Sequence, residues 1–469
     1  MSKKWWTLGA VGCGTFMAAL DAGIVNVGLP TLQRQFNTNL SHVSWVIESY
    51  FLVITCLLLP FGRISDGYGR KKIFGLGFLV FTLGSLLGGL SLNLLMLIVS
   101  RMIQAMGAAM LMANGPAIIT ASFPEKERGG ALGLLAMAVS AGLISGPSIG
   151  GILIGTVGWR TIFLVNVPIG LIGSQLVYRY LRDDPPLKRR LGFDWKGSYL
   201  QCGFILCLIF ACDPPLRFTT QPEYNKIIRL SLFALSIPLG IWFYKGESRH
   251  KAPIFDFSLL KNTTFWSANL SGLLHFIAYS SVFVLMPFFL ETVKTYNPAQ
   301  VGLLMSVVPL LILVVAPLSG RLSDRYGSVE LCALGAGATF LTLFLMSGII
   351  GPGIGEATSQ TSIVFYLGLV GLGLGLFQSP NNNAIMSSVP KQKLGVASAL
   401  LATLRNLSLV LGSAICTEIF AWQKEATSDF EVSLRVTFLV TSFFAIGAAL
   451  TAIIKERGPH WKTGNDKGK

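Results

Sequence analysis

The sequence has few charged residues and lacks the residue patterns of enzymes. Only 13% of its 469 residues are Asp, Glu, Lys or Arg, whereas soluble domains carry about 25%. It contains no glycine-rich phosphate-binding loop, no cysteine or histidine spacing typical of a metal site and no catalytic triad. We therefore expect no enzyme, no ATP hydrolysis by this chain, no metal and no cofactor beyond a proton gradient.

Hydrophobic residues, by contrast, make up 52% of the chain. Apolar runs of about 20 residues recur along it, which is long enough to cross a hydrocarbon core of roughly 30 Å. The sequence therefore predicts an all-α membrane protein. Fourteen transmembrane helices are expected at about 8–29, 42–61, 73–91, 94–119, 131–154, 161–180, 197–213, 227–244, 265–290, 299–319, 329–350, 363–386, 396–420 and 433–454.

The basic residues gather on one side of these helices. When Lys and Arg are counted by alternate connections, 27 fall on the side of both termini and 8 on the other. Cytoplasmic connections carry this excess in membrane proteins, so we expect both termini in the cytoplasm of a multi-pass plasma membrane protein, with the bacterial inner membrane as its location. The net charge of +15 is explained in this way and does not indicate nucleic acid as a partner.

A polar segment between two apolar runs occurs twice. Gly62-Arg-Ile-Ser-Asp-Gly-Tyr-Gly69 returns 258 positions later as Gly320-Arg-Leu-Ser-Asp-Arg-Tyr-Gly327, with six of eight residues identical. Residues 122–136 and 388–402 also match, at an offset of 266. Both matches connect helices of the same rank, so they indicate a duplication.

The duplication predicts two six-helix bundles in the same orientation, the plan of a transporter whose substrate path runs between its halves. The first bundle takes residues 1–180, and the second takes residues 263–469 with the cytoplasmic tail. Residues 181–262 form two inserted helices with basic cytoplasmic linkers, which have no counterpart in the repeat.

Three ionisable residues of the first bundle are expected at nearly one depth. Asp21, Glu48 and Arg101 come from three different helices, each about 10 Å from the outer face at 1.5 Å per residue. Charges inside a membrane are costly and mark functional sites by default. Burial raises the pKa of a carboxyl and a nearby Arg lowers it, so a shared site can take up and release protons. A permanent ion pair that only locks the helices together is the alternative, and Glu48 facing an outer vestibule is another.

The second bundle has polar residues but no acid near the middle of the membrane. Glu291 and Glu418 are expected near outer ends, in contact with solvent. A role in the substrate path and a role in helix packing both stay open for the polar side chains, and packing is the more common role for a lone histidine. These candidates are His275, Gln378, Asn381, Asn382, Arg405 and Asn406.

Two further groups of residues are candidates for regions that move during transport. Small residues near Pro147 in the fifth helix allow close helix contact, which suits a surface that closes and loosens, or simple tight packing. This group is Gly142, Gly146, Pro147, Gly150 and Gly151. The repeated polar segments carry charges that can form ion pairs on the cytoplasmic side. The gating candidates there are Gly62, Asp66, Gly69, Arg70, Arg321, Asp324 and Arg325.

Taken together, these segments resemble the major facilitator superfamily and its fourteen-helix drug:proton antiporter branch. The resemblance covers nearly the whole chain. It rests on Gly62–Lys72, on Arg101 with Gln104 and Gly107, on Gly142–Gly151, on Leu20–Pro30 and on Gly158–Gly170. The family implies alternating access, with protons flowing inward as substrate leaves and with Asp21 carrying the coupling proton.

The chain departs from the branch at Gly23, where Thr is usual, at Glu48, where a small polar residue is common, and in lacking acids near the middle of the membrane in its second half. We expect a proton-coupled exporter of amphipathic or lipophilic small molecules. Its partners are then an amphiphilic substrate, protons and the lipid bilayer. A monomer and the use of accessory export subunits both stay open. Export of a lipid, siderophore or other metabolite is the alternative, and a non-transporting sensor or scaffold is the minor one.

The repeated segment yields a first prediction. If ion pairs of Asp66 with Arg70, and of Asp324 with Arg321 or Arg325, latch the cytoplasmic side, Asp66→Asn should slow or abolish transport while substrate still binds. Binding and transport by the purified variant, measured side by side, test this. Loss of binding would count against a latch.

Overall fold

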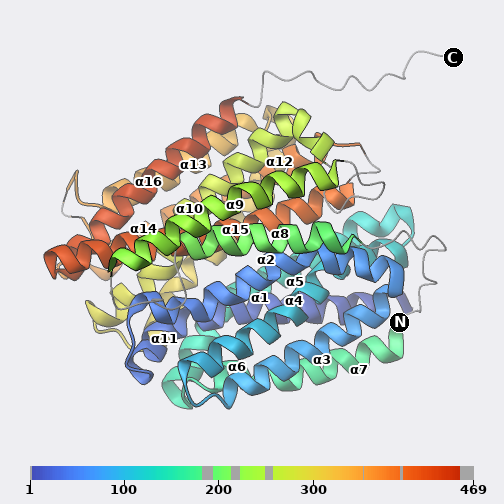
Figure 1. Ribbon diagram of the computed structural model, residues 1–469, viewed down its shortest axis with the longest axis horizontal. Coiled ribbons are helices and arrows are strands. Elements are labelled where there is room, and N and C mark those ends of the chain that lie inside the picture. Colours follow the sequence, from blue (N-terminus) through green and yellow to red (C-terminus); the bar gives the residue numbers. More distant parts are fainter. Residues whose placement is uncertain are drawn as a thin grey trace.

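The computed structural model describes residues 3–181, 194–212, 222–248, 257–351, 353–390 and 394–454. In this part of the chain, fourteen helical segments are long and apolar enough to cross a membrane, which confirms the predicted number and the all-α fold class. The N-terminal segments lie mainly in the lower part of Figure 1 and the C-terminal ones in the upper part.

The helices of the first half are α1 (Lys3–Gln35), α2 (Leu40–Tyr68), α3 (Arg70–Gly89), α4 (Leu94–Ser122), α5 (Glu125–Thr156), α6 (Thr161–Leu164) and α7 (Asn166–Tyr180). The inserted helices are α8 (Trp195–Cys212) and α9 (Pro222–Glu247). The second half comprises the short helix η1 (Phe257–Lys261) followed by α10 (Thr263–Thr292), α11 (Pro298–Met305), α12 (Val307–Tyr326), α13 (Val329–Met346), α14 (Gln360–Ser387), α15 (Leu394–Thr427) and α16 (Phe430–Ile454).

The repeated polar segments are helix ends rather than loops, which corrects the expectation from their composition. Helix α2 continues to Tyr68, and Gly69 alone connects it to α3. Gly69 and Gly327 have φ values of 99° and 92°, which side chains with a Cβ rarely adopt. Their N–H groups donate to Ser65 O and Ser323 O at 2.9 and 3.0 Å. We call the side of Gly69 and Gly327 the inner side, and the opposite side the outer side.

Other contacts repeat at the same offsets. Asn39 and Asn297, 258 residues apart, cap α2 and α11 with their side chains, and Asn93 and Ser359, 266 apart, cap α4 and α14. Glycine contacts repeat as well. A Cβ at Gly77 would lie 3.1 Å from Gly107 O, and a Cβ at Gly335 would lie 2.6 Å from Gly373 O. The two halves therefore share helix starts and close packing positions.

Hydrogen bonds and an ion pair join the halves on the outer side. Asn26 Nδ2 donates to Phe283 O at 2.8 Å, and Arg34 pairs with Glu291. Each of these pairs spans 257 residues, so each joins equivalent positions of α1 and α10. Glu291 is 5% exposed, so the expectation that it lies in solvent is wrong: its carboxylate has the Arg34 guanidinium as partner.

The tenth span is broken where it meets the other half. One continuous helix was expected at 299–319, but α11 ends at Met305 and α12 begins at Val307. The hydroxyl of Ser306, at the break, lies 2.7 Å from the Ser148 hydroxyl and donates to Ile144 O at 3.3 Å. The sixth span is likewise divided, between α6 and α7. The Ser306 contact ties the break to α5.

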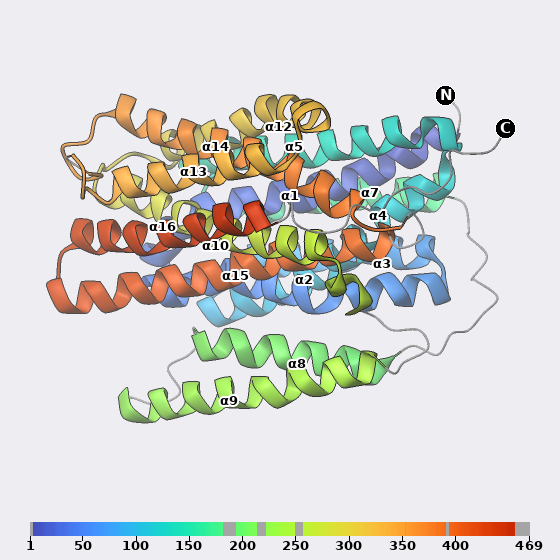
Figure 2. The ribbon, with the colours of Figure 1, turned by 90° about the horizontal axis from the view of Figure 1, so that it is seen from above.

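The inserted helices form a hairpin beside the two halves, as Figure 2 shows. Helix α8 packs against α2 and α15, which belong to different halves. Trp45 of α2 meets Phe210 of α8, with ring centroids 5.6 Å apart. Arg229 of α9 forms a bidentate ion pair with Glu418 of α15, with Nη1 2.5 Å from Oε1 and Nη2 3.2 Å from Oε2. The Glu418 side chain is 41% exposed, so the expected solvent contact is confirmed, and Arg229 pairs with it as well.

The contact between α5 and α11 leads to a prediction about the outer side. A Cβ at Gly151 would lie 3.1 Å from Ala299 Cα and still closer to the carbonyl oxygen of Pro298, whereas a Cβ at Gly155 would meet nothing within 4 Å. Overpacking costs about 1–3 kcal/mol, and each 1.4 kcal/mol is about tenfold in an equilibrium constant. Gly151→Leu should therefore lower the population with this side closed about tenfold.

Cysteines placed at Ser148 and Ser306 report the closure, because the two hydroxyl oxygens are only 2.7 Å apart. A short bifunctional reagent should cross-link them in the unchanged background and in the matched control Gly155→Leu. Cross-linking should fall sharply in Gly151→Leu. Equal cross-linking in both glycine variants would show that Gly151 does not govern the contact.

Candidate functional site

Asp21 of α1 and Arg101 of α4 form an ion pair inside the first half. Arg101 Nη1 lies 2.5 Å from Asp21 Oδ2, and the side chains are 1% and 0% exposed. Arg101 Nε also donates to Val46 O at 3.0 Å, and its guanidinium lies 4.1 Å from the centre of the Tyr50 ring. The structure thus brings together two of the three predicted charges and holds the cation against α2.

Two amides complete the surroundings of Asp21. Gln104 Nε2 donates to Asp21 Oδ1 at 2.7 Å and to Ser85 Oγ at 2.8 Å, while Gln104 Oε1 accepts from Arg101 at 2.5 Å. Asn166 Nδ2 donates to Asp21 Oδ1 at 2.9 Å. Every described partner of the carboxylate is a donor, and such donors stabilise its charged form.

The site therefore takes side chains from five helices, α1, α2, α3, α4 and α7. In the sequence, Gln104 stands out only as part of a helix pattern, and no pattern indicates Asn166 or Ser85 as site residues. Gln104 lies three residues after Arg101, hence on the same helix face, and that spacing was an available signal. Asn166 begins α7 after the break at Val165, and nothing in its local sequence indicates that it contacts Asp21.

Glu48 lies at the expected depth but on another side of α2. Val46 and Tyr50, one turn apart, face Arg101, and Glu48 is about 200° of helix rotation from each. Its Oε1 accepts from Ser413 Oγ of α15 at 2.6 Å, and the side chain is fully buried. The prediction that the three charges share one site is corrected for Glu48: its carboxylate lies at the contact between the halves, not at an outer vestibule.

The described residues of the second half contain no copy of this polar network. Gly146 meets Leu20 and Gly23, and Gly412 meets Ile277 and Ser280, which sets the offset of α1 and α10 at 257. Asp21 then corresponds to Ala278. At the offset of 266, Arg101 and Gln104 correspond to Leu367 and Val370. These three equivalent residues are apolar and fully buried, at 0% exposure each. The halves share a backbone plan but not this chemistry.

The predicted polar residues of the second half divide into two groups. His275 is fully buried and stacks on Phe377, with ring centroids 4.0 Å apart and an interplanar angle of 1°. Neither ring nitrogen has a hydrogen-bond partner in the described part of the chain, which fits packing. Asn406 is also buried, at 2% exposure.

The second group consists of three half-buried side chains and one buried amide. Gln378, Asn382 and Arg405 are half-buried, and Asn381, 2% exposed, points its amide nitrogen at Gly272 of α10. The distance from that nitrogen to a Cβ at Gly272 would be 3.1 Å. Helix α14 thus places the Asn381 amide against α10 on the inner half of the second bundle.

The glycines of α5 do two things at once. Gly142, Gly146 and Gly150 recur every fourth residue and lie against the backbone of α1, where a Cβ at each would fall 2.6 to 3.0 Å from a backbone atom. Gly151 faces α11 of the other half. Tight packing therefore describes Gly142, Gly146 and Gly150, while Gly151 lies at a contact between the halves. That this contact closes and loosens stays a prediction. Pro147 explains Gly23, since a Cβ there would lie 3.0 Å from Pro147 Cδ.

The gating candidates are described only in part. Arg70 is half-buried at the start of α3, and Arg321 is exposed on α12. The side chains of Asp66, Asp324 and Arg325 lie outside what the structure describes. The predicted ion pairs on the inner side therefore stay predictions.

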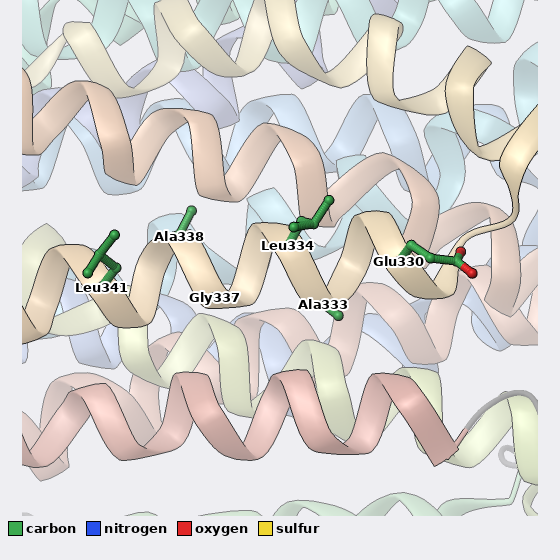
Figure 3. A pocket seen from close by; sticks show the side chains of 6 residues that line it. All are labelled: Glu330, Ala333, Leu334, Gly337, Ala338 and Leu341. Atoms are coloured by element: carbon green, nitrogen blue, oxygen red, sulfur yellow. The ribbon is translucent and has the colours of Figure 1, made fainter.

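A groove on α13 holds none of the candidate residues. Glu330, Ala333, Leu334, Gly337, Ala338 and Leu341 line it, and Figure 3 shows that all come from one helix. Leu334 and Leu341 are 62% and 49% exposed. An exposed leucine face on a membrane-length helix is the surface that lipid covers, so we place no site there.

Comparison with known proteins agrees with this architecture. Residues 11–413 match the family described as "Major Facilitator Superfamily". The chain is 35% identical over 466 residues to "Riboflavin transporter RibZ" of Clostridioides difficile (strain 630), covering 97% of this chain and 99% of that protein. It is 32% identical over 426 residues to "Multidrug resistance protein Stp" of Mycobacterium tuberculosis (strain CDC 1551 / Oshkosh), covering 90% and 77%.

Among solved structures, the chain is similar to a bacterial homolog of the human lysosomal transporter Spinster, in an inward-facing and unoccupied conformation. The TM-score is 0.71 at 14% identity, with 97% of this chain and 98% of that one covered. This likeness shows the fold. The family and the named resistance protein confirm the resemblance drawn from the motifs, and they indicate a transporter rather than an enzyme.

The buried ion pair yields a stability prediction. Removing one partner of a buried pair leaves an uncompensated charge and costs about 3–5 kcal/mol. Arg101→Met should therefore strongly destabilise the protein, whereas adding Asp21→Asn should recover a large part of the loss. Unfolding of the purified variants in a double-mutant cycle measures this. Additive losses would mean that the two side chains do not depend on each other.

Proposed function

Because the chain belongs to the Major Facilitator Superfamily, we propose that it is a proton-coupled secondary transporter that exports amphipathic small molecules by alternating access. The proposal includes a plasma membrane location with both termini in the cytoplasm. Asp21 is its proton site. The proton gradient is its energy source, and the membrane potential alone supplies about 2.3 kcal/mol per charge per 100 mV.

The observation that carries the proposal is the buried contact of Asp21 with Arg101 at 2.5 Å. A charged pair inside a membrane is costly, so its presence marks a functional site by default. A proton added to Asp21 removes the negative charge that holds Arg101, and it weakens the bonds from Gln104 and Asn166. Since these partners lie on α4 and α7, protonation loosens α1 from its neighbours. Proton binding is thereby linked to helix arrangement.

The contacts between the halves support alternating access. Glu48 with Ser413 and Ser148 with Ser306 close two contacts on the outer side. Glu48 and Ser306 are 258 residues apart, so one partner of each contact occupies the equivalent position of the repeat. Opening to the outer side requires both contacts to separate. Helix α1 carries Asp21 and also bonds the other half through Asn26, which gives protonation a route to this interface.

A second candidate is transport of riboflavin. It is favoured by the 35% identity to a riboflavin transporter over almost the full length of both chains. The ring of riboflavin is planar and rich in hydrogen-bonding groups, which suits the amides of Gln378, Asn381 and Asn382. Riboflavin should therefore be tested beside amphipathic compounds in one transport assay, and which of them the protein moves separates the two candidates.

Replacing Asp21 tests the function. In proteoliposomes with an imposed proton gradient, Asp21→Asn should lose gradient-driven accumulation of whichever compound the unchanged protein moves. Exchange of that compound across the membrane without a gradient should continue, because the substrate path is kept. The matched control is Glu127→Gln, which removes an acid paired with Lys4 on the inner side. Gradient-driven transport that survives Asp21→Asn would refute the proton assignment.

A further inference from the structure

Arg405 is a membrane-embedded cation of a different kind from Arg101. It lies on α15, about 14 Å from the inner end of the span that begins at Val396. Its side chain is half-buried. Among the described residues, the guanidinium has no carboxylate within ion-pair distance and no hydrogen-bond partner. A charge at this depth requires water or a charged partner, and no described acid supplies one.

The geometry of α15 gives the direction of Arg405. Gly412 faces α10, since a Cβ there would lie 2.9 Å from Ile277 Cα, and Ser413 faces α2 through Glu48. At 100° per residue, Arg405 falls in the arc between these two positions, about 20° from Gly412 and about 80° from Ser413. It therefore points between α10 of its own half and α2 of the other half, toward the space that separates the halves.

Arg405 lies at the same depth as the Asn381 amide. It lies seven residues, about 10 Å, nearer the inner side than Gly412. Helices α10 and α15 both run outward from the inner side, so Arg405 lies level with residues 270–273 of α10. Gly272 in that stretch meets the amide of Asn381. The cation and at least one amide from α14 thus lie at one depth, and the contact of Glu48 with Ser413 is about 12 Å farther out.

We propose that Arg405 binds the oxyanion of an amphipathic organic anion, a carboxylate or phosphate attached to an apolar or aromatic body. This names the substrate class of the proposed function and rests on it. A guanidinium matches both oxyanions through paired N–H groups. The described acids of the second half give Arg405 no internal counter-charge, so the substrate supplies it. A cationic substrate is repelled at the same place.

A comparison of equivalent positions supports the assignment of the anion site to the second half. At the offset of 266, Arg405 of α15 corresponds to Val139 of α5, while Asp21 and Arg101 correspond to apolar residues of the second half. One half therefore carries the proton site and the other carries an unpaired cation. The ligand and the proton bind to different halves, so their coupling passes through the contacts between the halves.

Two dyes that share a xanthene ring but differ in charge test the proposal. Fluorescein is an anion with a carboxylate, and rhodamine 6G is a cation with an ester. Fluorescence anisotropy with the full-length protein in detergent should show tighter binding of fluorescein. Arg405→Gln should weaken fluorescein binding about tenfold or more and leave rhodamine 6G unchanged or tighter. Arg405→Lys, which keeps the charge but loses the paired N–H groups, should lie between.

The matched control is Arg179→Gln, which removes an exposed cation at the inner end of α7 and should not alter the ratio of the two affinities. The assignment is overturned if the unchanged protein prefers rhodamine 6G, or if Arg405→Gln leaves the ratio as it was. Anion binding that depends on Arg405, without any gradient-driven movement in proteoliposomes, would refute the transport function and keep the site. Gradient-driven transport with a charge preference that does not change in Arg405→Gln would refute the anion site and leave the transport function intact.

Discussion

The ion pair of Asp21 and Arg101 is the interaction on which the first half depends. Two charges have been taken out of water, so each must find its compensation within the protein. Gln104 and Asn166 complete the set around the carboxylate, and Tyr50 covers the guanidinium. Helices α1, α4 and α7 are therefore positioned by one polar centre as well as by apolar packing. Any change of protonation there acts on all three helices together.

The two halves share one backbone plan but differ in chemistry, because the fold constrains the packing positions and not the charged ones. Helix caps and glycine contacts repeat at offsets of 258 and 266, because close packing of helices allows few alternatives at those positions. A polar network is not required by the fold. The second half replaces it with Ala278, Leu367 and Val370, and it places its cation on another helix. Duplication preserved the packing and left the charged positions free to diverge.

Much of this arrangement could be predicted from the sequence, for identifiable reasons. Membrane length fixes the spans, and the cost of burying charge selects Asp21 and Arg101. Depth along a helix follows from counting residues, but direction around it does not. Glu48 was therefore placed at the right level and assigned to the wrong neighbours. Its partner Ser413 is 365 residues away, and no local pattern specifies such a contact.

The helix ends were harder to predict than the spans. The segment from Gly62 to Gly69 reads as a loop because it is polar and rich in glycine, yet α2 continues through it to Tyr68. Capping and the positive φ of Gly69 set the true end. Asn166 illustrates the same limit, since its contact with Asp21 depends on where α7 begins. These are tertiary features that composition does not encode.

The hairpin of α8 and α9 has a consequence for molecules that arrive from the lipid. Two seams run between the halves, one where α2 meets α15 and one where α5 meets α11 and α12. The hairpin lies against α2 and α15, so it covers the first seam and leaves the second facing the bilayer. A lipophilic compound dissolved in the membrane thus meets two unequal flanks. Within the described part of the chain, the insertion therefore breaks the two-fold symmetry that the repeated halves would otherwise give to the flanks of the transporter.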